Sequence, residues 1–315
     1  MPIPRIAVLI PCLNEAQTIN KVVSDFRQQL PEALIYVYDN ASTDETSKVA
    51  QEAGALVVLS PERGKGSVVR QMFREVDADI YILVDGDDTY PAEAIRDLLE
   101  PVKSHLADMV VGDRLSSTYD KQNKRRFHSF GNRLVRLLIN RLYGAELRDI
   151  LSGYRVFNRL FVKNFPIQST GFEIETEMSL HALDKRFRIK SLPIHYQNRP
   201  EGSESKLKTY SDGVRVLRTI ISIFKNYRPM PFFGGLAFVF FILGLFAGIW
   251  PILDYVEHQY VYRVPLAILA TGLILSGLIA LAIGIILNTV SHFHRIHYDH
   301  QINLYLESRQ GKKEY

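Results

Sequence analysis

The chain has 315 residues, a formal net charge of +4 and a single cysteine, Cys12. Such a mild charge excludes the strongly basic surface of a nucleic-acid-binding protein, so no nucleic-acid partner is expected. A lone cysteine excludes an intramolecular disulfide and is typical of a reducing compartment.

Short apolar runs alternate with helical patterns over the first part of the chain. Strands are expected at 5–10, 34–38, 56–59, 80–84 and 109–111, and helices at 16–29, 43–53, 65–76 and 92–105. This alternation predicts an α/β fold with a mostly parallel sheet and helices on both faces.

The acidic sequence Asp85-Gly86-Asp87-Asp88 directly follows the fourth expected strand. Open α/β sheets bind ligands beyond the carboxyl ends of their strands. Mg²⁺ or Mn²⁺ prefers oxygen ligands, which it shares with substrate phosphates. We therefore predict a metal and diphosphate site here. The alternative is a solvated acidic turn.

Polar groups also follow the first three expected strands. These segments are residues 11–15, 39–44 and 63–66. Carboxylates and amides at the first two positions suit a base and a ribose, while Lys65 between two glycines suits a phosphate. Each group has a structural alternative, since Asn14 and Asp44 would also cap helices and the glycines would also turn the chain.

Two almost uncharged stretches, 231–253 and 264–290, each exceed the roughly 20 residues that a helix needs to cross a bilayer. They predict an integral membrane protein, although buried helices of a large soluble core are the alternative. The segment 254–263 between them is short, polar and rich in tyrosine, so the spans should form an antiparallel hairpin.

Charge placement predicts the orientation of this hairpin. Its connecting segment carries one cation, Arg263, whereas the outer flanks carry Lys225, Arg228, Arg295, Arg309, Lys312 and Lys313. The positive-inside rule then places everything before residue 230 and both termini in the cytoplasm, with the spans in the cell membrane. No signal peptide is evident at the start of the chain.

Basic and apolar residues alternate at helical spacing in residues 132–143 and 211–228. Such amphipathic helices lie well on an anionic membrane surface, although packing on the domain core with solvated arginines is the alternative. The expected organisation is a soluble α/β domain over 1–210, an interfacial helix over 211–229, a membrane region over 230–292 and a cytoplasmic tail over 293–315.

The polar segments together resemble glycosyltransferase family 2. The motifs are PCLNE (11–15), DNASTDET (39–46), RGKG (63–66), DGDDTYP (85–91), VVGDR (110–114), SGYRVF (152–157) and NRPEGSESK (198–206). Within the family the chain looks like the polyprenyl-phosphate branch, and its paired C-terminal spans look most like a bactoprenol glucosyltransferase. The resemblance implies a GT-A fold, a nucleotide-diphosphate sugar donor, Mg²⁺ or Mn²⁺, inversion at the anomeric carbon and a polyprenyl phosphate acceptor.

The resemblance also implies roles for single residues. Asp39 would contact the base, Asp85 the ribose or the metal, and Asp87 the metal that bridges the donor diphosphate. Cationic groups would surround the acceptor phosphate, although surface salt bridging is their alternative. The expected site is then catalytic Asp87, Asp149 and Arg114; donor-binding Pro11, Asn14, Glu15, Asp39, Ser42, Asp44, Lys65, Asp85 and Gly86; acceptor-binding Arg114, Arg133, Arg199 and Lys206; and metal-binding Asp85 and Asp87.

Asp149 looks like the residue usually nominated as the base in related inverting enzymes. A phosphate monoester has a second pKa of about 6, so the acceptor is already mostly deprotonated at neutral pH. We therefore expect Asp149 to orient the acceptor or nearby arginines at least as much as it accepts a proton.

The expected reaction is hexose transfer to undecaprenyl phosphate, and the hairpin favours UDP-glucose as donor. A GDP-mannose-dependent mannose synthase is the alternative, and a non-catalytic lipid-binding scaffold is the alternative of another class. A processive synthase would carry more spans and a QxxRW-like segment, whereas the only tryptophan is Trp250. A nucleotidyltransferase would carry a glycine-rich N-terminal signature. A homo-oligomer is compatible with the resemblance.

Two further groups have open interpretations. The histidines at 292, 294, 297 and 300 have a spacing that suits Zn²⁺ or Cu²⁺, or they lie on a helix that continues from the second span. The glutamates at 173, 175 and 177 either line the acceptor cleft or cap a helix and face solvent.

Overall fold

The computed structural model describes residues 4–115, 126–171, 173–197, 225 and 228–310, without the side chains of 126–132 and 308–310. The chain forms two compact units, Met1–Tyr210 and Ser211–Tyr315. The expected interfacial helix over 211–229 lies almost entirely outside the described residues.

The first unit is built on a sheet of seven described strands in the order β3-β2-β1-β4-β6-β5-β7. Only β6 runs antiparallel to its neighbours, β4 and β5, so the expected mostly parallel sheet is confirmed. The strands are β1 Ile6–Cys12, β2 Leu34–Asp39, β3 Leu56–Leu59, β4 Ile80–Leu83, β5 Met109–Asp113, β6 Arg155–Asn158 and β7 Ile189–Pro193.

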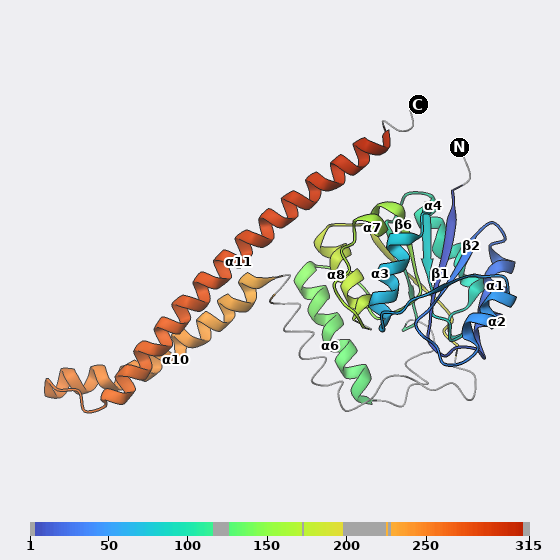
Figure 1. Ribbon diagram of the computed structural model, residues 1–315. Coiled ribbons are helices and arrows are strands. Elements are labelled where there is room, and N and C mark those ends of the chain that lie inside the picture. The colour runs from blue at the N-terminus through green and yellow to red at the C-terminus, as the bar shows by residue number, and fades with distance from the viewer. Residues whose placement is uncertain (1–3, 116–125, 172, 198–224, 226–227, 311–315) are drawn as a thin grey trace. The chain divides into compact units, whose positions relative to one another are not determined.

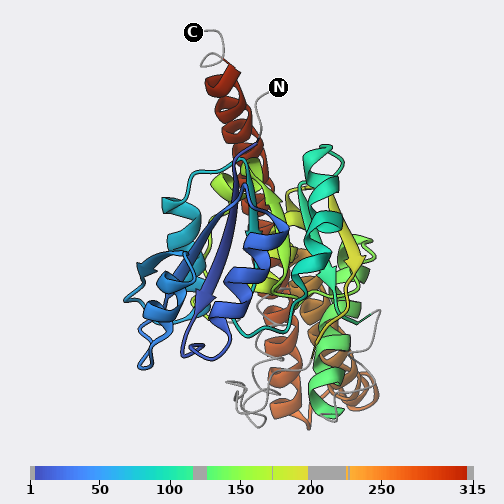
Figure 2. The ribbon, with the colours of Figure 1, turned by 90° about the vertical axis from the view of Figure 1, so that its right-hand side faces the viewer.

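Helices cover both faces of this sheet (Figures 1 and 2). Successive β1 side chains point to opposite faces, so Val8 and Ile10 join one hydrophobic core while Ala7 and Leu9 join the other. The first core includes α1 (Ile19–Gln29), α2 (Thr46–Glu52) and α4 (Ile95–Lys103), which a short turn, η1 (Ala92–Ala94), precedes. The second core includes α3 (Lys65–Glu75), α7 (Arg159–Asn164) and α8 (Ile174–Asp184).

Helix α6 (Arg126–Tyr143) shows both faces expected of an amphipathic helix. Val135 and Ile139, one turn apart, are buried, whereas Leu134 and Leu137 are exposed together with Arg133. One face therefore packs in the domain, as in the alternative interpretation, and the other combines leucine with arginine.

The described part of the second unit contains α10 (Pro229–His258) and α11 (Val264–Gln310), both long and apolar enough to cross a membrane. Glycines allow the two helices to approach closely. A Cβ on Gly244 would lie 2.8 Å from Ile274 Cγ1, and one on Gly284 would lie 2.9 Å from Phe233 Cβ. The structure thus contains the expected hairpin.

Both helices are longer than the expected spans. Helix α10 continues through His258, so half of the expected polar loop is helical, and Asp254 within it forms an ion pair of 2.7 Å with Arg263. Helix α11 continues to Gln310, through most of the expected tail 293–315. The sequence from 285 to 310 contains neither glycine nor proline, so nothing in it interrupts the helix.

Candidate functional site

The loops that follow β1, β2 and β4 meet at the carboxyl edge of the sheet. Asn40 N donates to Cys12 O at 2.8 Å, and Thr18 Oγ1 donates to Gly86 O at 2.6 Å. A Cβ on Gly86 would lie 2.7 Å from Cys12 Sγ. The expected donor-binding segments therefore form one continuous surface, with Pro11 half-buried at the end of β1.

Asp39 ends β2 and is buried, with 4% exposure. Its Oδ1 accepts from Ser42 N at 2.8 Å, and its Oδ2 accepts from Ser47 Oγ at 2.5 Å. Because both oxygens already accept hydrogen bonds, the carboxylate keeps one orientation within the loop.

The loop after β1 is joined to the loop after β2 by side chains from both. Asn14, which has a positive φ of 53°, donates from its N to Ser42 Oγ at 2.9 Å and accepts from Thr43 N at 2.8 Å. Glu15 N donates to Thr46 Oγ1 at 2.9 Å. These contacts support the structural reading of Asn14, which holds the second loop in place.

Asp44 also has a structural role at the start of α2. Its carboxylate accepts from Thr46 N and from Ala16 N, each at 3.1 Å. Burial alone would raise the pKa of Asp44, but the hydrogen bonds from Thr46 and Ala16 outweigh it and lower the pKa. Asp44 is therefore a helix-start acceptor that also binds the first loop.

The acidic loop after β4 places its carboxylates in different surroundings. Asp87 is 4% exposed, and its Oδ1 accepts from Thr89 Oγ1 at 2.6 Å. Asp88 instead pairs with Lys21 at 2.7 Å. Asp85 pairs with Lys65, whose Nζ lies 2.5 Å from Asp85 Oδ1. The loop is therefore not a solvated acidic turn.

Lys65 forms a second ion pair, with Glu175 at the start of α8. The distance from Lys65 Nζ to Glu175 Oε1 is 2.6 Å, and the two side chains are 10% and 6% exposed. Burial lowers the pKa of Lys65, but Asp85 and Glu175 outweigh it and raise the pKa above its usual range. The ammonium therefore stays charged and has carboxylate partners, where a phosphate partner was expected.

The glycines beside Lys65 make room for the chain itself. Gly64 has a φ of 112°, and a Cβ on Gly64 or Gly66 would clash with the backbone at Thr170 or Ser169. Gly66 N also donates to Thr170 O at 3.0 Å. The close approach that the sequence suggested is thus made by residues 169–170.

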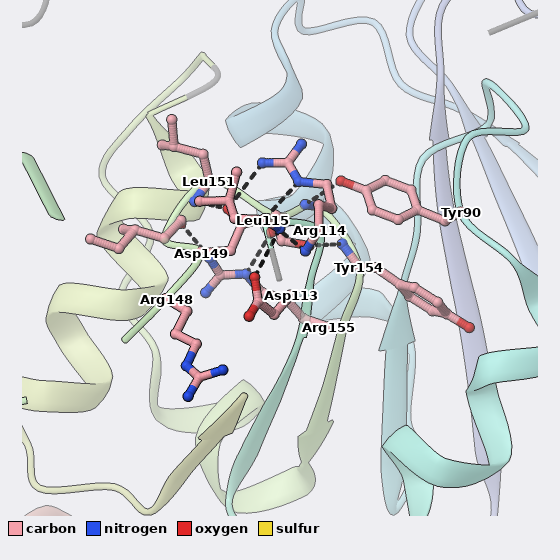
Figure 3. Close-up of polar contacts among 12 residues, drawn as sticks. Tyr90, Asp113, Arg114, Leu115, Arg148, Asp149, Leu151, Tyr154 and Arg155 are labelled. Carbon is pink, nitrogen blue, oxygen red and sulfur yellow. Dashed lines mark hydrogen bonds and ion pairs between the residues drawn. The ribbon is translucent and has the colours of Figure 1, made fainter. Parts of the chain in front are cut away.

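Arg114 and Asp149 form a two-point ion pair (Figure 3). Arg114 Nε donates to Asp149 Oδ2 at 2.7 Å, and Arg114 Nη2 donates to Oδ1 at 3.0 Å. Asp149 is 3% exposed. Burial raises the pKa of Asp149, but Arg114 outweighs it, with a smaller contribution from Arg155, and the pKa is lowered.

Arg155, in β6, is fully buried and was missed by the sequence analysis. Its Nη2 donates to Ile150 O at 2.6 Å, and its Nη1 donates to Ser179 Oγ at 3.0 Å. It therefore ties the loop that carries Asp149 to the helix that carries Glu175. The only signal in the sequence was its place in the SGYR segment.

A cluster of tyrosines lies between the Asp85 loop and Arg114. Tyr90 OH accepts from Gly153 N at 2.9 Å, and the Tyr90 ring lies 5.3 Å from that of Tyr196. The Arg114 guanidinium lies 5.5 Å from the centre of the Tyr196 ring. The aromatic rings thus connect the two charged parts of the site.

The remaining expected residues are less informative. Arg133 is exposed on α6, and Arg199 and Lys206 lie outside the described residues. Glu175 and Glu177 lie in the first turn of α8, but their carboxylates do not simply face solvent. Glu177 accepts from Gln168 N at 2.8 Å, and Glu175 pairs with Lys65.

No metal-binding group of three or more His, Cys, Asp or Glu side chains occurs among the described residues. The histidines at 292–300 therefore form no such site on α11, which continues through them as a helix. Asp85 and Asp87 supply two carboxylates. Such a pair fits Mg²⁺ or Mn²⁺ when substrate phosphates complete the coordination.

Comparison with known proteins gives concordant results. The family model described as glycosyl transferase family 2 matches residues 7–165. Glycosyltransferase AglJ of Haloferax volcanii is 32% identical over 297 residues, which cover 94% of this chain and 97% of that protein. The dolichyl-phosphate hexose transferase of the same organism is 26% identical over 219 residues, 69% of this chain and 93% of that protein.

A solved structure shares the fold of the first unit. Glucosyl-3-phosphoglycerate synthase from Mycobacterium tuberculosis, in complex with Mn²⁺, UDP and glucosyl-3-phosphoglycerate, superposes with a TM-score of 0.55. The match is 22% identical and covers 70% of this chain and 78% of that one.

Proposed function

Because this chain belongs to glycosyl transferase family 2, we propose that it transfers a hexose from a nucleotide-diphosphate sugar to a polyprenyl phosphate. The chain is a glycosyltransferase, and the predicted GT-A fold is confirmed. The proposed acceptor is supported by the relative that is named a dolichyl-phosphate hexose transferase.

One observation carries the proposal. Asp39 ends β2, and Asp85 and Asp87 lie on the loop that follows β4; these two strands flank β1 and run parallel to it. In open α/β sheets this edge binds the ligand. Arg114 follows β5 in the same unit, pairs with Asp149 ahead of β6, and supplies a guanidinium group that suits a phosphate.

Asp87 and Asp85 are the residues that would hold a divalent cation. Bound there, the cation would supply Lewis-acid stabilisation of the negative charge that develops on the departing nucleoside diphosphate. Asp87 is oriented for this role by Thr89, whose hydroxyl donates to Oδ1. Asp39 is held by Ser42 and Ser47 in a fixed orientation for the base.

On the acceptor side, Arg114 would bind the attacking phosphate and Asp149 would hold Arg114. A phosphate monoester is mostly a dianion at neutral pH, because its second pKa is about 6. The nucleophile therefore needs little proton abstraction. The lowered pKa of Asp149 makes it a weak base, which supports an orienting role.

We infer that the second unit anchors the enzyme in the cell membrane. Each of the two helices contains a window of mean hydropathy 2.5. A polyprenyl phosphate keeps its tail in the bilayer, so an anchored enzyme meets its acceptor at a high effective concentration. The cations beside the helices support cytoplasmic termini and a cytoplasmic catalytic unit.

The proposed donor is UDP-glucose, which the hairpin favours, and GDP-mannose is the second candidate. The test is to incubate the purified protein with undecaprenyl phosphate, Mg²⁺ or Mn²⁺, and UDP- or GDP-sugars in turn. We expect the extracted lipid to gain the mass of one hexose with one donor. An unchanged lipid with every donor would contradict the proposal.

Two controls complete the experiment. Replacement of both Asp85 and Asp87 by alanine should abolish product, and product formation by that variant would remove the metal-site assignment. A non-catalytic scaffold would bind the lipid but would release no nucleoside diphosphate in the presence of the metal. A homo-oligomer is also proposed, and light scattering of the purified protein tests it.

A further inference from the structure

Glu175 occupies a position that its sequence context did not explain. It lies in the first turn of α8, is 4% exposed, and pairs with Lys65, which also pairs with Asp85. We propose that Glu175 is a positioning residue of the donor site: by sharing the Lys65 ammonium with Asp85, it fixes the direction of the Asp85 carboxylate. This inference rests on the proposed donor site.

The charges of the three residues depend on one another. Lys65 is 10% exposed, and it forms an ion pair with each of the two carboxylates. A buried carboxylate without a cation is strongly unfavourable, and an ammonium with three donors can serve both acids. Lys65 is therefore held by ion pairs from two sides, and loss of Glu175 would remove one of these two ion pairs.

Asp85 is held on its other side by the backbone. A Cβ on Gly153 would lie 2.6 Å from Asp85 Oδ2, so the carboxylate packs directly against that glycine. Oδ1 faces Lys65. The orientation of the Asp85 carboxylate thus depends on the Lys65 ammonium at Oδ1 and on Gly153 at Oδ2. Glu175 controls the position of the Lys65 ammonium.

Glu175 is itself fixed by α8 and Arg155. Ser179 Oγ donates to Glu175 O at 3.0 Å and accepts from Arg155 Nη1 at 3.0 Å. The first turn of a helix also favours a negative charge. Glu175 is therefore a rigid, charged support for Lys65, in contrast to a mobile surface acid.

The test is a double-mutant cycle on Glu175 and Lys65, with nucleotide affinity as the main measurement. Glu175→Gln keeps the size of the side chain and removes its charge. The nucleotide is UDP or GDP, whichever the wild type binds in the presence of Mn²⁺. We expect the Kd of Glu175→Gln for this nucleotide to rise about tenfold, because the loss of one charge-assisted hydrogen bond has an effect of this size. In transfer assays the donor KM should rise while kcat changes by less than about threefold.

If Glu175 acts through Lys65, the two substitutions will not add. In a Lys65→Met background, Glu175→Gln should cause no further loss of affinity, because its partner is gone. A tenfold loss in that background as well would overturn the proposal, and so would a Glu175→Gln Kd within about twofold of the wild type.

Asp108→Asn controls for a general loss of stability. Asp108 is also buried and pairs with Arg188 at 2.8 Å, but it precedes β5 and so lies at the amino edge of the sheet. It should lower the Tm without changing the nucleotide Kd. If it weakens nucleotide binding as much as Glu175→Gln at an equal loss of Tm, the effect is not specific and the proposal fails.

The outcomes also separate this inference from the proposed function. A protein that binds nucleotide with the expected Glu175 dependence but never glycosylates undecaprenyl phosphate would contradict the proposed acceptor alone. A wild-type protein that binds neither UDP nor GDP with Mn²⁺ would overturn both.

Discussion

Arg114 donates from its side chain to both carboxylate oxygens of Asp149, at 2.7 and 3.0 Å. The same oxygens accept from two backbone groups, Arg114 N at 3.2 Å and Leu151 N at 3.1 Å. A carboxylate with this many donors is stabilised in its charged form. The pair thus fixes the loop after β5 against the loop that precedes β6.

The first prediction concerns acid stability. The pKa of Asp149 is lowered below its ordinary value of 3.8 in the folded protein, so the pair stabilises the fold above that value. This stabilisation should be lost as the pH falls through the lower, folded pKa. Urea unfolding between about pH 2 and pH 7 should therefore show a steeper acid loss in the wild type than in Asp149→Asn.

At neutral pH, Asp149→Asn should lower the unfolding free energy by about 3 kcal/mol, because Arg114 keeps its charge and loses its partner. Its transfer rate should also fall, by a similar factor at every pH. Recovery of the rate when the pH is raised would identify Asp149 as a proton acceptor and contradict the orienting role. Parallel acid-unfolding curves for both proteins would contradict the first prediction.

The second prediction concerns Arg155, whose guanidinium is fully buried. Burial lowers its pKa to about 10, although Glu175 and Asp149 oppose this change. A lysine in its place has one ammonium for the three separated oxygen acceptors, Ser152 O, Ile150 O and Ser179 Oγ, and an intrinsically lower pKa. Arg155→Lys should therefore destabilise the protein by about 3 kcal/mol.

Thermal unfolding of Arg155→Lys measures this loss. Arg141→Lys on α6 is the matched control, since Arg141 is exposed and its replacement should leave the Tm unchanged. Equal Tm values for the two variants would show that the buried guanidinium contributes nothing specific.

Much of the fold could be predicted from local patterns. The expected helix 65–76 agrees with α3 to within one residue. The agreement is this close because the apolar residues of the helix repeat at helical spacing and bury one face. The strands β6 and β7 were not expected. β6 has four residues and begins with a buried arginine, so it lacks an apolar pattern, and its antiparallel pairing depends on distant strands.

The site was predictable only in part, for a similar reason. Asp39, Asp85 and Asp87 directly follow strands, and this position in the sequence already indicates the binding edge. The partnership of Lys65 with Glu175 depends on how α8 packs beside α3, which no short motif encodes. The acidic series at 173–177 was the only signal for it.

The third prediction compares two buried tyrosines. Tyr90 OH accepts from Gly153 N, whereas Tyr154 OH has no hydrogen-bond partner among the described residues. Tyr90→Phe should cost about 1–2 kcal/mol, because it leaves a buried N–H unpaired. Tyr154→Phe should be neutral or stabilising, since it removes an unsatisfied hydroxyl. Thermal unfolding of both variants checks this, and a larger loss for Tyr154→Phe would reverse the assignment.

The fourth prediction concerns Gly64, one of the two glycines that flank Lys65, the residue that the sequence assigned to a phosphate. Its φ of 112° is strained for any other residue, and a Cβ would meet Thr170 O. Its N also donates to Asn40 Oδ1 at 2.8 Å, which connects it to the loop after β2. Gly64→Ala should therefore lower the free energy of unfolding by about 2 kcal/mol or more, which a lower Tm reports. It should also weaken nucleotide binding, because it displaces Lys65.

Gly272→Ala in α11 is the control for Gly64→Ala, because a Cβ there meets nothing within 4 Å and alanine favours a helix. It should leave nucleotide affinity unchanged. If Gly64→Ala kept the wild-type Tm but lost nucleotide binding, the glycine would instead make room for a phosphate bound at Lys65. A joint loss of stability and affinity instead assigns it to the contact with residues 169–170, on which the position of Lys65 depends.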